Sequence, residues 1–535
     1  MKTKAQYILL LLLPVLFLIS GIMLRSAQGP FYLNFYDPSY QYLINSLNLA
    51  QKFGVGHFDH PGTTVQVIGA VSVKLQHMTG GVNSEIAKDV LTRPEDYLQV
   101  INKVLIAINS IVLFLLGLLT LRWSKNIYLS LLIQLSPFVS LEIFYGLKIV
   151  SPDNLLIAVS LSLIGLIMFY LFKVDPQKRS SLSFVIVAAV ICGFGMATKI
   201  SFLPFLIIPF VIINGIKNKL LYCGFVILSF LIFVLPAISN YAKFGEWVGR
   251  LFFYTGSYGQ GTSGVVDVPD FFENMRSIFT KDVFFAVTYV LSFLTLAFRF
   301  ISPKINDESL IQRSKKEWKI LFTVFIAITI QVIMVSKQYR QHYMIPSFVF
   351  CILLLSISAS LISTYLPKVK LRYSYPALIL VIASFAFPAI VESYSVCKWL
   401  RSESYMVEDF INNNKGDAMV IPAFGSASKD MAIVYGISGA GKRVKTYKVM
   451  FSEMQNNYLF YFPWQGSLYT ILDKADAMVI FDSNKKIIFH TVQDNVVSFL
   501  EMLRSVYNVK IVSSKLIFEN KINEKVYEIQ VENVH

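Results

Sequence analysis

Long runs of apolar residues recur along most of the chain, and each is about as long as a membrane-spanning helix. A bilayer core about 30 Å thick is crossed by about 20 mostly apolar helical residues. On that scale the sequence predicts about eleven transmembrane helices. They lie near residues 5–24, 103–121, 127–145, 154–172, 182–198, 201–216, 220–238, 283–300, 320–336, 345–366 and 373–391. The expected fold class is therefore a polytopic, all-α membrane protein.

The hydrophobic pattern changes after residue 391. Shorter or alternating apolar runs are typical of strands, and they occur at 417–422, 430–435, 477–482, 509–513 and 526–531. The stretch 492–506 has apolar residues at helical spacing and predicts an amphipathic helix. We therefore expect two domains. Residues 1–391 form a membrane domain that includes a long loop with amphipathic helices at 25–100, and residues 392–535 form a small α/β domain.

Composition excludes a soluble enzyme. Of the 535 residues, 55% are hydrophobic and only 15% are charged, whereas soluble proteins average about 25% charged residues. The mean hydropathy is +0.57. The net charge of +15 would suit a nucleic-acid partner, but none is expected, because the basic residues concentrate in the connections between apolar runs.

The placement of these basic residues predicts the orientation. Every second connection is rich in Lys and Arg, as cytoplasmic loops are; these connections hold Arg122/Lys125, Lys173/Lys178/Arg179, Lys217/Lys219, Arg299 through Lys319, and Lys368/Lys370/Arg372. The first run is longer than a signal-peptide core, so we interpret it as a retained anchor with a cytoplasmic N-terminus. An odd number of spans then puts the C-terminal domain outside, in the periplasm or extracellular space. No N-x-S/T sequon occurs and Ile, Lys and Asn are abundant, which favours a bacterial inner membrane.

The first outer loop carries two polar motifs. Asp37-Pro38 could be a helix N-cap followed by a proline at the first helical position, and His60-Pro61-Gly62 could be only a turn. However, an acidic residue just beyond a membrane exit also suits catalysis, and capping geometry would fix such a carboxylate in place. Asp37, with Asp59 and His60, is therefore a candidate for the site.

Two further ionisable residues lie at apolar helix ends. Asp153 could cap the fourth span, but a second carboxylate at the same outer level as Asp37 makes a shared site plausible, because ionisable groups near hydrocarbon are costly. Lys199 ends the stretch that begins at Gly195, and taken alone it is most simply interpreted as a snorkelling lysine.

The turn at 336–344 breaks the charge pattern. Lys337 and Arg340 are basic but lie on the expected outer side, next to His342 and Tyr343. Arg offers a two-pronged donor set for phosphate oxygens, and Lys offers a point charge. This turn therefore predicts a phosphate-binding site, with an ordinary exposed basic turn as the alternative.

Two other motifs are less specific. Gly436 to Lys442 matches the phosphate-loop pattern G-x-x-x-x-G-K, but Arg443 follows where Ser or Thr would hold magnesium, so we expect a turn. The aromatic run Tyr458, Phe460, Tyr461, Phe462 and Trp464 could stack on sugar rings. Packing in a core or at the membrane interface is the favoured interpretation.

In order along the chain, these residues resemble the GT-C superfamily of polytopic membrane glycosyltransferases, especially the protein O-mannosyltransferase and lipid A aminoarabinose transferase type (glycosyltransferase family 39-like). Asp37 matches the family's acidic motif in the first outer loop, and His60-Pro61-Gly62 departs from its His-Pro-Pro element at the third position. Asp153 looks like the acidic position of the next outer connection. Gly195 to Lys199 is similar to a Gly-x-x-x-Lys stretch, and Arg340, His342-Tyr343 and Pro346 look like an Arg-Tyr-x-x-x-x-Pro turn. The resemblance covers roughly residues 30–350.

The resemblance implies an inverting glycosyltransferase that moves a hexosyl or pentosyl group from a polyprenyl-phosphate donor to a glycan, lipid or protein acceptor at the outer face. Asp37 would be the general base. Lys337, Arg340 and Lys199 would hold the donor phosphate. Asp153 would orient the acceptor, tune Asp37 or help bind a divalent metal, and Asp59, His60, His342 and Tyr343 would line the site. No cofactor is otherwise expected, and Pro38, where the family has a second acidic residue, weakens the case for a metal.

Three alternatives remain open from the sequence. A flippase or transporter of a lipid-linked sugar could use the same residues to grip a phosphate, although the chain has no internal repeat of the kind common in transporters. An O-antigen ligase or polymerase would share the membrane setting without this order of motifs. A structural membrane protein with a partner-binding outer domain would leave the basic turn unexplained.

Overall fold

The chain forms two compact units in a computed structural model, which describes residues 2–33, 36–175, 178–256, 259, 261–301, 307–366, 368–454, 459–472 and 486–533. Unit 1 comprises Met1–Ile22, Phe58–Val65 and Lys103–Ser393, and unit 2 comprises Met23–His57, Gln66–Asn102 and Tyr394–His535. Most of the outer loop at 25–100 thus groups with the C-terminal residues, whereas the sequence placed it with the membrane helices.

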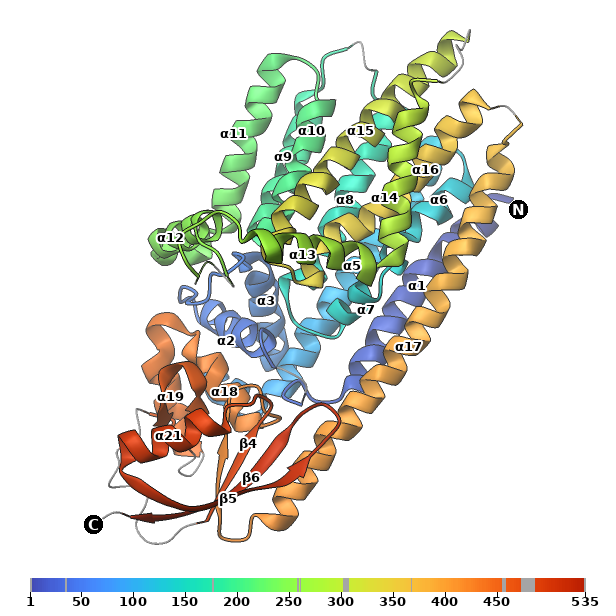
Figure 1. Cartoon of the computed structure of the whole chain (residues 1–535). Coiled ribbons are helices and arrows are strands. Elements are labelled where there is room, and N and C mark those ends of the chain that lie inside the picture. The colour runs from blue at the N-terminus through green and yellow to red at the C-terminus, as the bar shows by residue number, and fades with distance from the viewer. Residues whose placement is uncertain are drawn as a thin grey trace. The chain divides into compact units, whose positions relative to one another are not determined.

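Unit 1 is helical, and the chain is a multi-pass membrane protein. Among the described residues, seven helices are long and apolar enough to span a bilayer, or eight if the pair α13 (Val268–Lys281) and α14 (Val283–Phe298), bent by 98°, counts as one span (Figure 1). The seven are α1 (Lys2–Gln28), α5 (Pro94–Ser124), α8 (Pro152–Lys173), α11 (Ile216–Phe233), α15 (Glu308–Ser336), α16 (Ile345–Tyr365) and α17 (Leu371–Asn414).

Three predicted spans take other forms. The segment predicted at 127–145 breaks into α6 (Ile127–Gln134), the 3-10 turn η1 (Ser136–Phe138) and α7 (Leu141–Leu147), because Pro137 cannot donate a helical hydrogen bond. The segment 201–216 becomes the 3-10 helix η2 (Ile200–Leu206) and the short α10 (Ile207–Ile212), with Pro204 and Pro209 inside. The segment 182–198 is helix α9 (Leu182–Thr198), which is apolar but only 17 residues long. The predicted count of eleven was therefore too high by this criterion.

Helix α16 lies at the centre of unit 1. Its apolar window is 83% buried, the highest value among the seven candidate spans, and it packs against α8, α14 and α15 (Figure 1). Helices α9 and α11 approach closely at Gly193, where an added Cβ would lie 2.4 Å from the Ser229 side chain. Small residues allow such close approach between helices in a bilayer.

Unit 2 holds the sheet. Its four strands are ordered β1-β4-β6-β5: β1 (Met419–Pro422) pairs parallel with β4 (Lys486–Thr491), and β4 and β5 (Val509–Glu519) pair antiparallel with β6 (Lys525–Asn533). Helix α21 (Val496–Tyr507) packs on the sheet through Phe499, whose ring stacks 3.8 Å from that of Phe489. The predicted small α/β region is confirmed, as are the predicted helix and the strands at 417–422, 509–513 and 526–531.

The run 430–435 is helical, so that predicted strand was wrong. It lies in α18 (Lys429–Ser438), where Ser428 caps the helix by accepting from the Met431 N–H, and such a cap stabilises a helix start. Four consecutive residues, Met431 to Val434, are buried, so the run has no strand-like alternation. The predicted strand at 477–482 lies outside the described residues.

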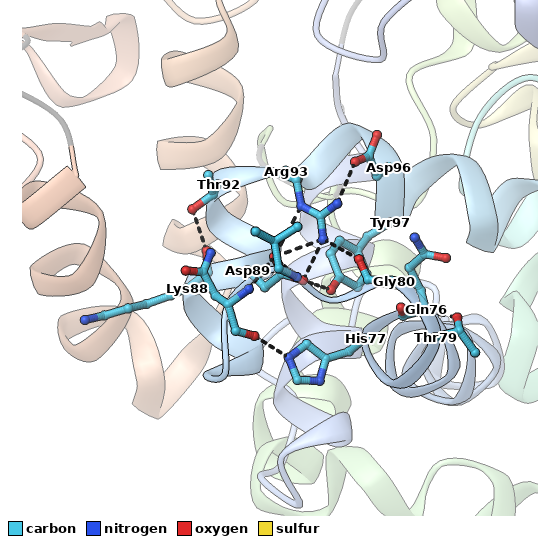
Figure 2. A network of polar contacts seen from close by, with 12 residues as sticks. Gln76, His77, Thr79, Gly80, Lys88, Asp89, Thr92, Arg93, Asp96 and Tyr97 are labelled. Atoms are coloured by element: carbon cyan, nitrogen blue, oxygen red, sulfur yellow. Dashed lines mark hydrogen bonds and ion pairs between the residues drawn. The ribbon is translucent and has the colours of Figure 1, made fainter.

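Unit 2 also holds an ion pair whose carboxylate is buried. Helix α4 (Ile86–Thr92) carries Asp89, which is fully buried and accepts hydrogen bonds from Arg93 and from the Tyr97 hydroxyl (Figure 2). Arg93 also donates to the Gly80 carbonyl at the end of α3 (Thr63–Gly80), at 2.9 Å. Burial alone would raise the pKa of Asp89, but the hydrogen bonds from Arg93 and Tyr97 outweigh it and lower the pKa to about 2.

The glycine-rich stretch 436–442 is a packing turn, as expected. The Gly439 carbonyl accepts from Asn45 and the Ala440 carbonyl from Asn48, both on α2 (Ser39–Ala50). A Cβ on Gly56 would lie 2.1 Å from the Gly441 nitrogen. These glycines therefore allow two backbone segments to pack closely together.

Candidate active site

A pocket of about 250 Å³ lies in unit 1. Its wall is mostly apolar and also holds several polar side chains, as is typical of ligand sites. The polar lining residues are His60, Lys199, Ser201, Gln331, Lys337, Gln338 and Tyr343, and the aromatic ones include Trp247, Phe252 and Phe271.

Lys199 is the buried charge of this pocket. It is 2% exposed, and its Nζ donates to both carboxylate oxygens of Asp153, at 2.7 and 2.9 Å. The Nζ also lies 4.6 Å from the centre of the Tyr343 ring. Lys199 is therefore not a snorkelling side chain, and Asp153 does not cap α8, which begins after Ser151 without a side-chain cap. A buried charge of this kind requires its partner.

The backbone around Lys199 fixes it beside His60. Lys199 lies in the break between α9 and η2, where it forms a β-bridge with Pro61, and the Ile200 N–H donates to the His60 carbonyl at 2.7 Å. Gly195 packs on Phe202, whose ring would lie 2.4 Å from an added Cβ. The Gly-x-x-x-Lys spacing thus allows the tight turn that aims Lys199 at Asp153.

The His60 ring lies between two aromatic rings of the pocket. It is perpendicular to Trp247 at 5.7 Å and tilted against Tyr343 at 6.1 Å. His60 and Tyr343 stood out in the sequence, but Trp247 did not. Trp247 is buried on the strongly amphipathic helix α12 (Tyr241–Phe253). The gathering of apolar residues on one face of that helix is the sequence signal that could have pointed to Trp247.

Gln331 connects several segments of the pocket wall by hydrogen bonds. It is fully buried on α15, and its amide donates to the carbonyls of Ser201 and Tyr343 at 3.0 and 2.8 Å, while the Ser347 hydroxyl donates to its side-chain oxygen. A lone Gln in an apolar run gave no specific signal of this role. The buried Ser201 hydroxyl lines the pocket and has no hydrogen-bond partner among the described residues, so it can accept or donate to a ligand.

The basic turn contributes to the pocket through one of its two cations. Lys337 lines the pocket and donates to the Phe252 carbonyl at 2.8 Å; burial lowers its pKa. Arg340 is exposed, and neither it nor His342 is among the lining residues. The His342 ring lies 4.6 Å from that of Tyr343.

The remaining predicted site residues are placed differently. Asp59 is half-buried next to His60 but does not line the pocket. Asp37 belongs to unit 2, where it precedes α2; that helix begins at Ser39 with Pro38 as its N-cap residue and no side-chain cap. The N-cap interpretation of Asp37 was therefore wrong.

Glu142 is an acidic residue of unit 1 that the sequence analysis missed. It lies on α7, which is not one of the candidate spans, and burial, with a smaller contribution from the Asp153 charge, raises its pKa to about 7 against the effects of Lys148 and Lys199. Only the structure brings this carboxyl into the electrostatic environment of the Asp153–Lys199 pair.

The donor set does not favour a metal. Among the described residues, no group of three or more His, Cys, Asp or Glu side chains could hold a metal ion. The carboxylate of Asp153 is already engaged by the Lys199 ammonium, a cation that competes with a metal for the same oxygens. We therefore derive no step through a metal at Asp37 and Asp153.

Comparison with known proteins identifies the fold. No protein-family model matches the chain, and a search of curated protein sequences found no match. Among solved structures, the crystal structure of ArnT from Cupriavidus metallidurans bound to undecaprenyl phosphate matches with a TM-score of 0.50 and 9% sequence identity, over 96% of this chain and 97% of that one. The chain therefore has the fold of the GT-C polytopic membrane glycosyltransferases.

Proposed function

We propose that the protein is a glycosyltransferase that moves a sugar from a polyprenyl-phosphate donor to an acceptor at the outer face of a bacterial inner membrane. The observation that carries this proposal is the buried Lys199–Asp153 pair, whose lysine lines a mostly apolar pocket. A polyprenyl phosphate has the same character, with an anionic head on a hydrocarbon chain. The match to a structure with undecaprenyl phosphate bound supports the same donor class.

In this proposal Lys199 and Lys337 bind the donor phosphate together. Asp153 offsets much of the charge of Lys199, so the pair alone attracts the phosphate anion of the donor weakly. Lys337, with no carboxylate within ion-pair distance among the described residues, supplies the second charge. Arg340 is assigned to guiding the anion towards the pocket from its exposed position.

The reaction itself is a displacement at the anomeric carbon. Asp37 takes the proton of the acceptor hydroxyl, the acceptor oxygen forms the new bond to the anomeric carbon, and the bond from that carbon to the phosphate oxygen breaks with inversion. The electron pair leaves with the polyprenyl phosphate, whose developing charge Lys199 and Lys337 stabilise. His60, Trp247 and Tyr343 enclose the sugar or the first prenyl units.

The test is to incubate the purified protein in nanodiscs with radiolabelled polyprenyl-phosphate sugars and a membrane extract as the acceptor source. We expect labelled product together with an equal amount of free polyprenyl phosphate, and we expect Lys337→Ala to reduce both at limiting donor. A flippase would instead move intact donor across a vesicle membrane without cleaving it. Donor movement without release of polyprenyl phosphate would overturn the proposal in favour of transport.

A further inference from the structure

The aromatic run at 458–464 divides into buried and exposed residues. Phe460, Tyr461 and Phe462 form strand β2 (Phe460–Phe462) and are buried, whereas Trp464, in the 3-10 turn η7 (Pro463–Gln465), is 60% exposed. Packing in a core thus holds for the strand, whereas Trp464 lies at the surface. Tyr458 lies outside the described residues. An exposed indole on a structured turn calls for a separate explanation.

Packing beneath Trp464 holds its ring in place. The Phe424 ring lies 4.8 Å away at 77°, and the Phe462 ring lies 5.4 Å away. The turn closes at Gly466, which adopts a left-handed conformation with φ of +57°, so strand β3 (Ser467–Tyr469) can return antiparallel to β2. The indole is therefore an ordered, rigid surface that loses little side-chain entropy when it binds a ligand.

The same cluster reaches the proposed catalytic base within unit 2. Phe424 contacts Tyr36 at 5.8 Å, and Tyr435 contacts both of these rings. The buried Tyr36 hydroxyl accepts from the Gly425 N–H at 2.8 Å, which fixes the residue directly before Asp37. Ring contacts thus connect Trp464 through Phe424 to Tyr36, the residue before the proposed base.

We propose that Trp464 is a stacking platform for a sugar ring of the acceptor, so that the acceptor is a glycan or carries one. This inference rests on the proposed function, because it takes Asp37 as the base that receives the acceptor hydroxyl. The flat C–H face of a pyranose packs on an indole face as other apolar groups do. The exposed Gln465 beside it offers donors and an acceptor for sugar hydroxyls.

A membrane anchor is the other use of an exposed tryptophan, and the surroundings of Trp464 argue against it. Among the described residues of the hairpin 460–469, Trp464 is the sole exposed large apolar side chain, and its neighbours Gln465 and Gly466 are exposed too. Interfacial anchoring uses an apolar face made of several residues, often with basic residues alongside. A single aromatic ring among polar neighbours is better suited to one sugar ring.

Binding can be tested separately from transfer. Protein labelled with 5-fluorotryptophan is placed in nanodiscs, and the Trp464 resonance is assigned by its loss in Trp464→Phe. Titration with cellotetraose, N-acetylchitotetraose and mannotetraose should shift that resonance for at least one sugar, whereas the resonance of Trp399, also partly exposed in unit 2, should stay in place. Absence of a Trp464 shift with all three sugars, or quenching of Trp464 fluorescence by brominated lipids, would overturn the inference.

Kinetic measurements provide a second test once an acceptor that the protein glycosylates has been identified. Trp464→Ala should raise KM for the acceptor by about three- to tenfold, the effect of losing one aromatic contact, and leave kcat and KM for the donor unchanged; Trp464→Phe should recover part of the loss. Trp399→Ala is the matched control. An unchanged acceptor KM in Trp464→Ala would contradict the inference, whereas a protein that binds sugars through Trp464 but transfers none would contradict only the proposed function.

Discussion

At the scale of single residues, the Lys199–Asp153 pair carries both stability and proposed function. Each side chain is almost fully buried, and an ion pair taken out of water gains little net stability, although loss of one partner leaves the other charge uncompensated. Such a pair is costly to maintain in an apolar unit. The place of Lys199 on the pocket wall gives a functional reason for the cost.

Substitutions at this pair should separate folding from activity. Lys199→Met should lower the free energy of unfolding by about 3–5 kcal/mol because it strands the Asp153 charge. The double variant Lys199→Met, Asp153→Leu should recover most of that loss and yet transfer no sugar. Thermal unfolding in nanodiscs, followed by the transfer assay, measures both effects. An active double variant would remove the pair from the site.

The Asp89 carboxylate makes the stability of the folded protein depend on pH. Because hydrogen bonds hold its folded pKa at about 2, below the ordinary value of 3.8, its stabilisation is fully present above that ordinary value and is lost as pH falls towards 2. Asp89→Asn should therefore lower the free energy of unfolding at pH 7 by about 1–3 kcal/mol, through weaker bonds to Arg93; thermal unfolding measures the loss. The difference from wild type should shrink below pH 4. A stability difference between Asp89→Asn and wild type that stays constant down to pH 2 would contradict this explanation.

Two of the residues that line the pocket stood out in the sequence because their charge was out of place. Lys199 and Lys337 both line the pocket, and each stood out in the sequence as a cation at an apolar helix end or on the outer side. Gln331 was missed because a neutral polar residue in a membrane protein gives no such contrast, and Trp247 was missed although the apolar face of its helix was a signal. Their roles depend on which helices meet, which the spacing of one segment does not specify.

At the scale of elements, proline and glycine decide where helices break and where backbones meet. Pro137, Pro204 and Pro209 were visible in the sequence, but the predicted spans 127–145 and 201–216 ran through or beside them because their hydrophobicity was continuous. Hydropathy reports burial in hydrocarbon or protein, and short buried helices have the same composition as spans. The predicted strand at 430–435 failed for a related reason, since a continuous apolar run fits a buried helix equally well.

The contact between Gly56 and Gly441 should tolerate no side chain. Gly56→Ala would bring a Cβ against the Gly441 backbone, which cannot move as a side-chain end can, and overpacking of this kind costs about 1–3 kcal/mol. Thermal unfolding should show that loss, whereas Gly80→Ala, whose nearest contact is the Gln76 side chain at 3.5 Å, should be close to neutral. Equal stability of the two variants would contradict a packing role for this turn.

At the scale of the whole molecule, alternation of charge across successive connections set the expected orientation. The overall class, a multi-pass membrane protein with a small C-terminal sheet, follows directly from hydropathy and strand patterns. The grouping of the outer loop with the C-terminal residues in unit 2 could not be predicted from these patterns. It arises from contacts such as those of Asn45 and Asn48 with residues nearly 400 positions later.

The orientation predicts which surfaces a membrane-impermeant reagent can reach. In a variant whose four native cysteines are replaced, Ser438→Cys, exposed in unit 2, should react with an impermeant maleimide in spheroplasts. Lys178→Cys, in a basic connection and 82% exposed, should react only after the membrane is permeabilised. The reverse pattern of labelling would invert the proposed topology.

The central claim is that Asp37 activates the acceptor for transfer from a lipid-phosphate donor. Its most direct test compares wild type and Asp37→Asn, in nanodiscs and at saturating donor, for release of polyprenyl phosphate coupled to product. We predict a fall in kcat of about 10²–10⁴-fold, the usual contribution of a general base, with donor binding and melting temperature unchanged. Asp96→Asn, which neutralises another carboxylate of unit 2, should transfer normally. Transfer by folded Asp37→Asn at the wild-type rate would contradict the account.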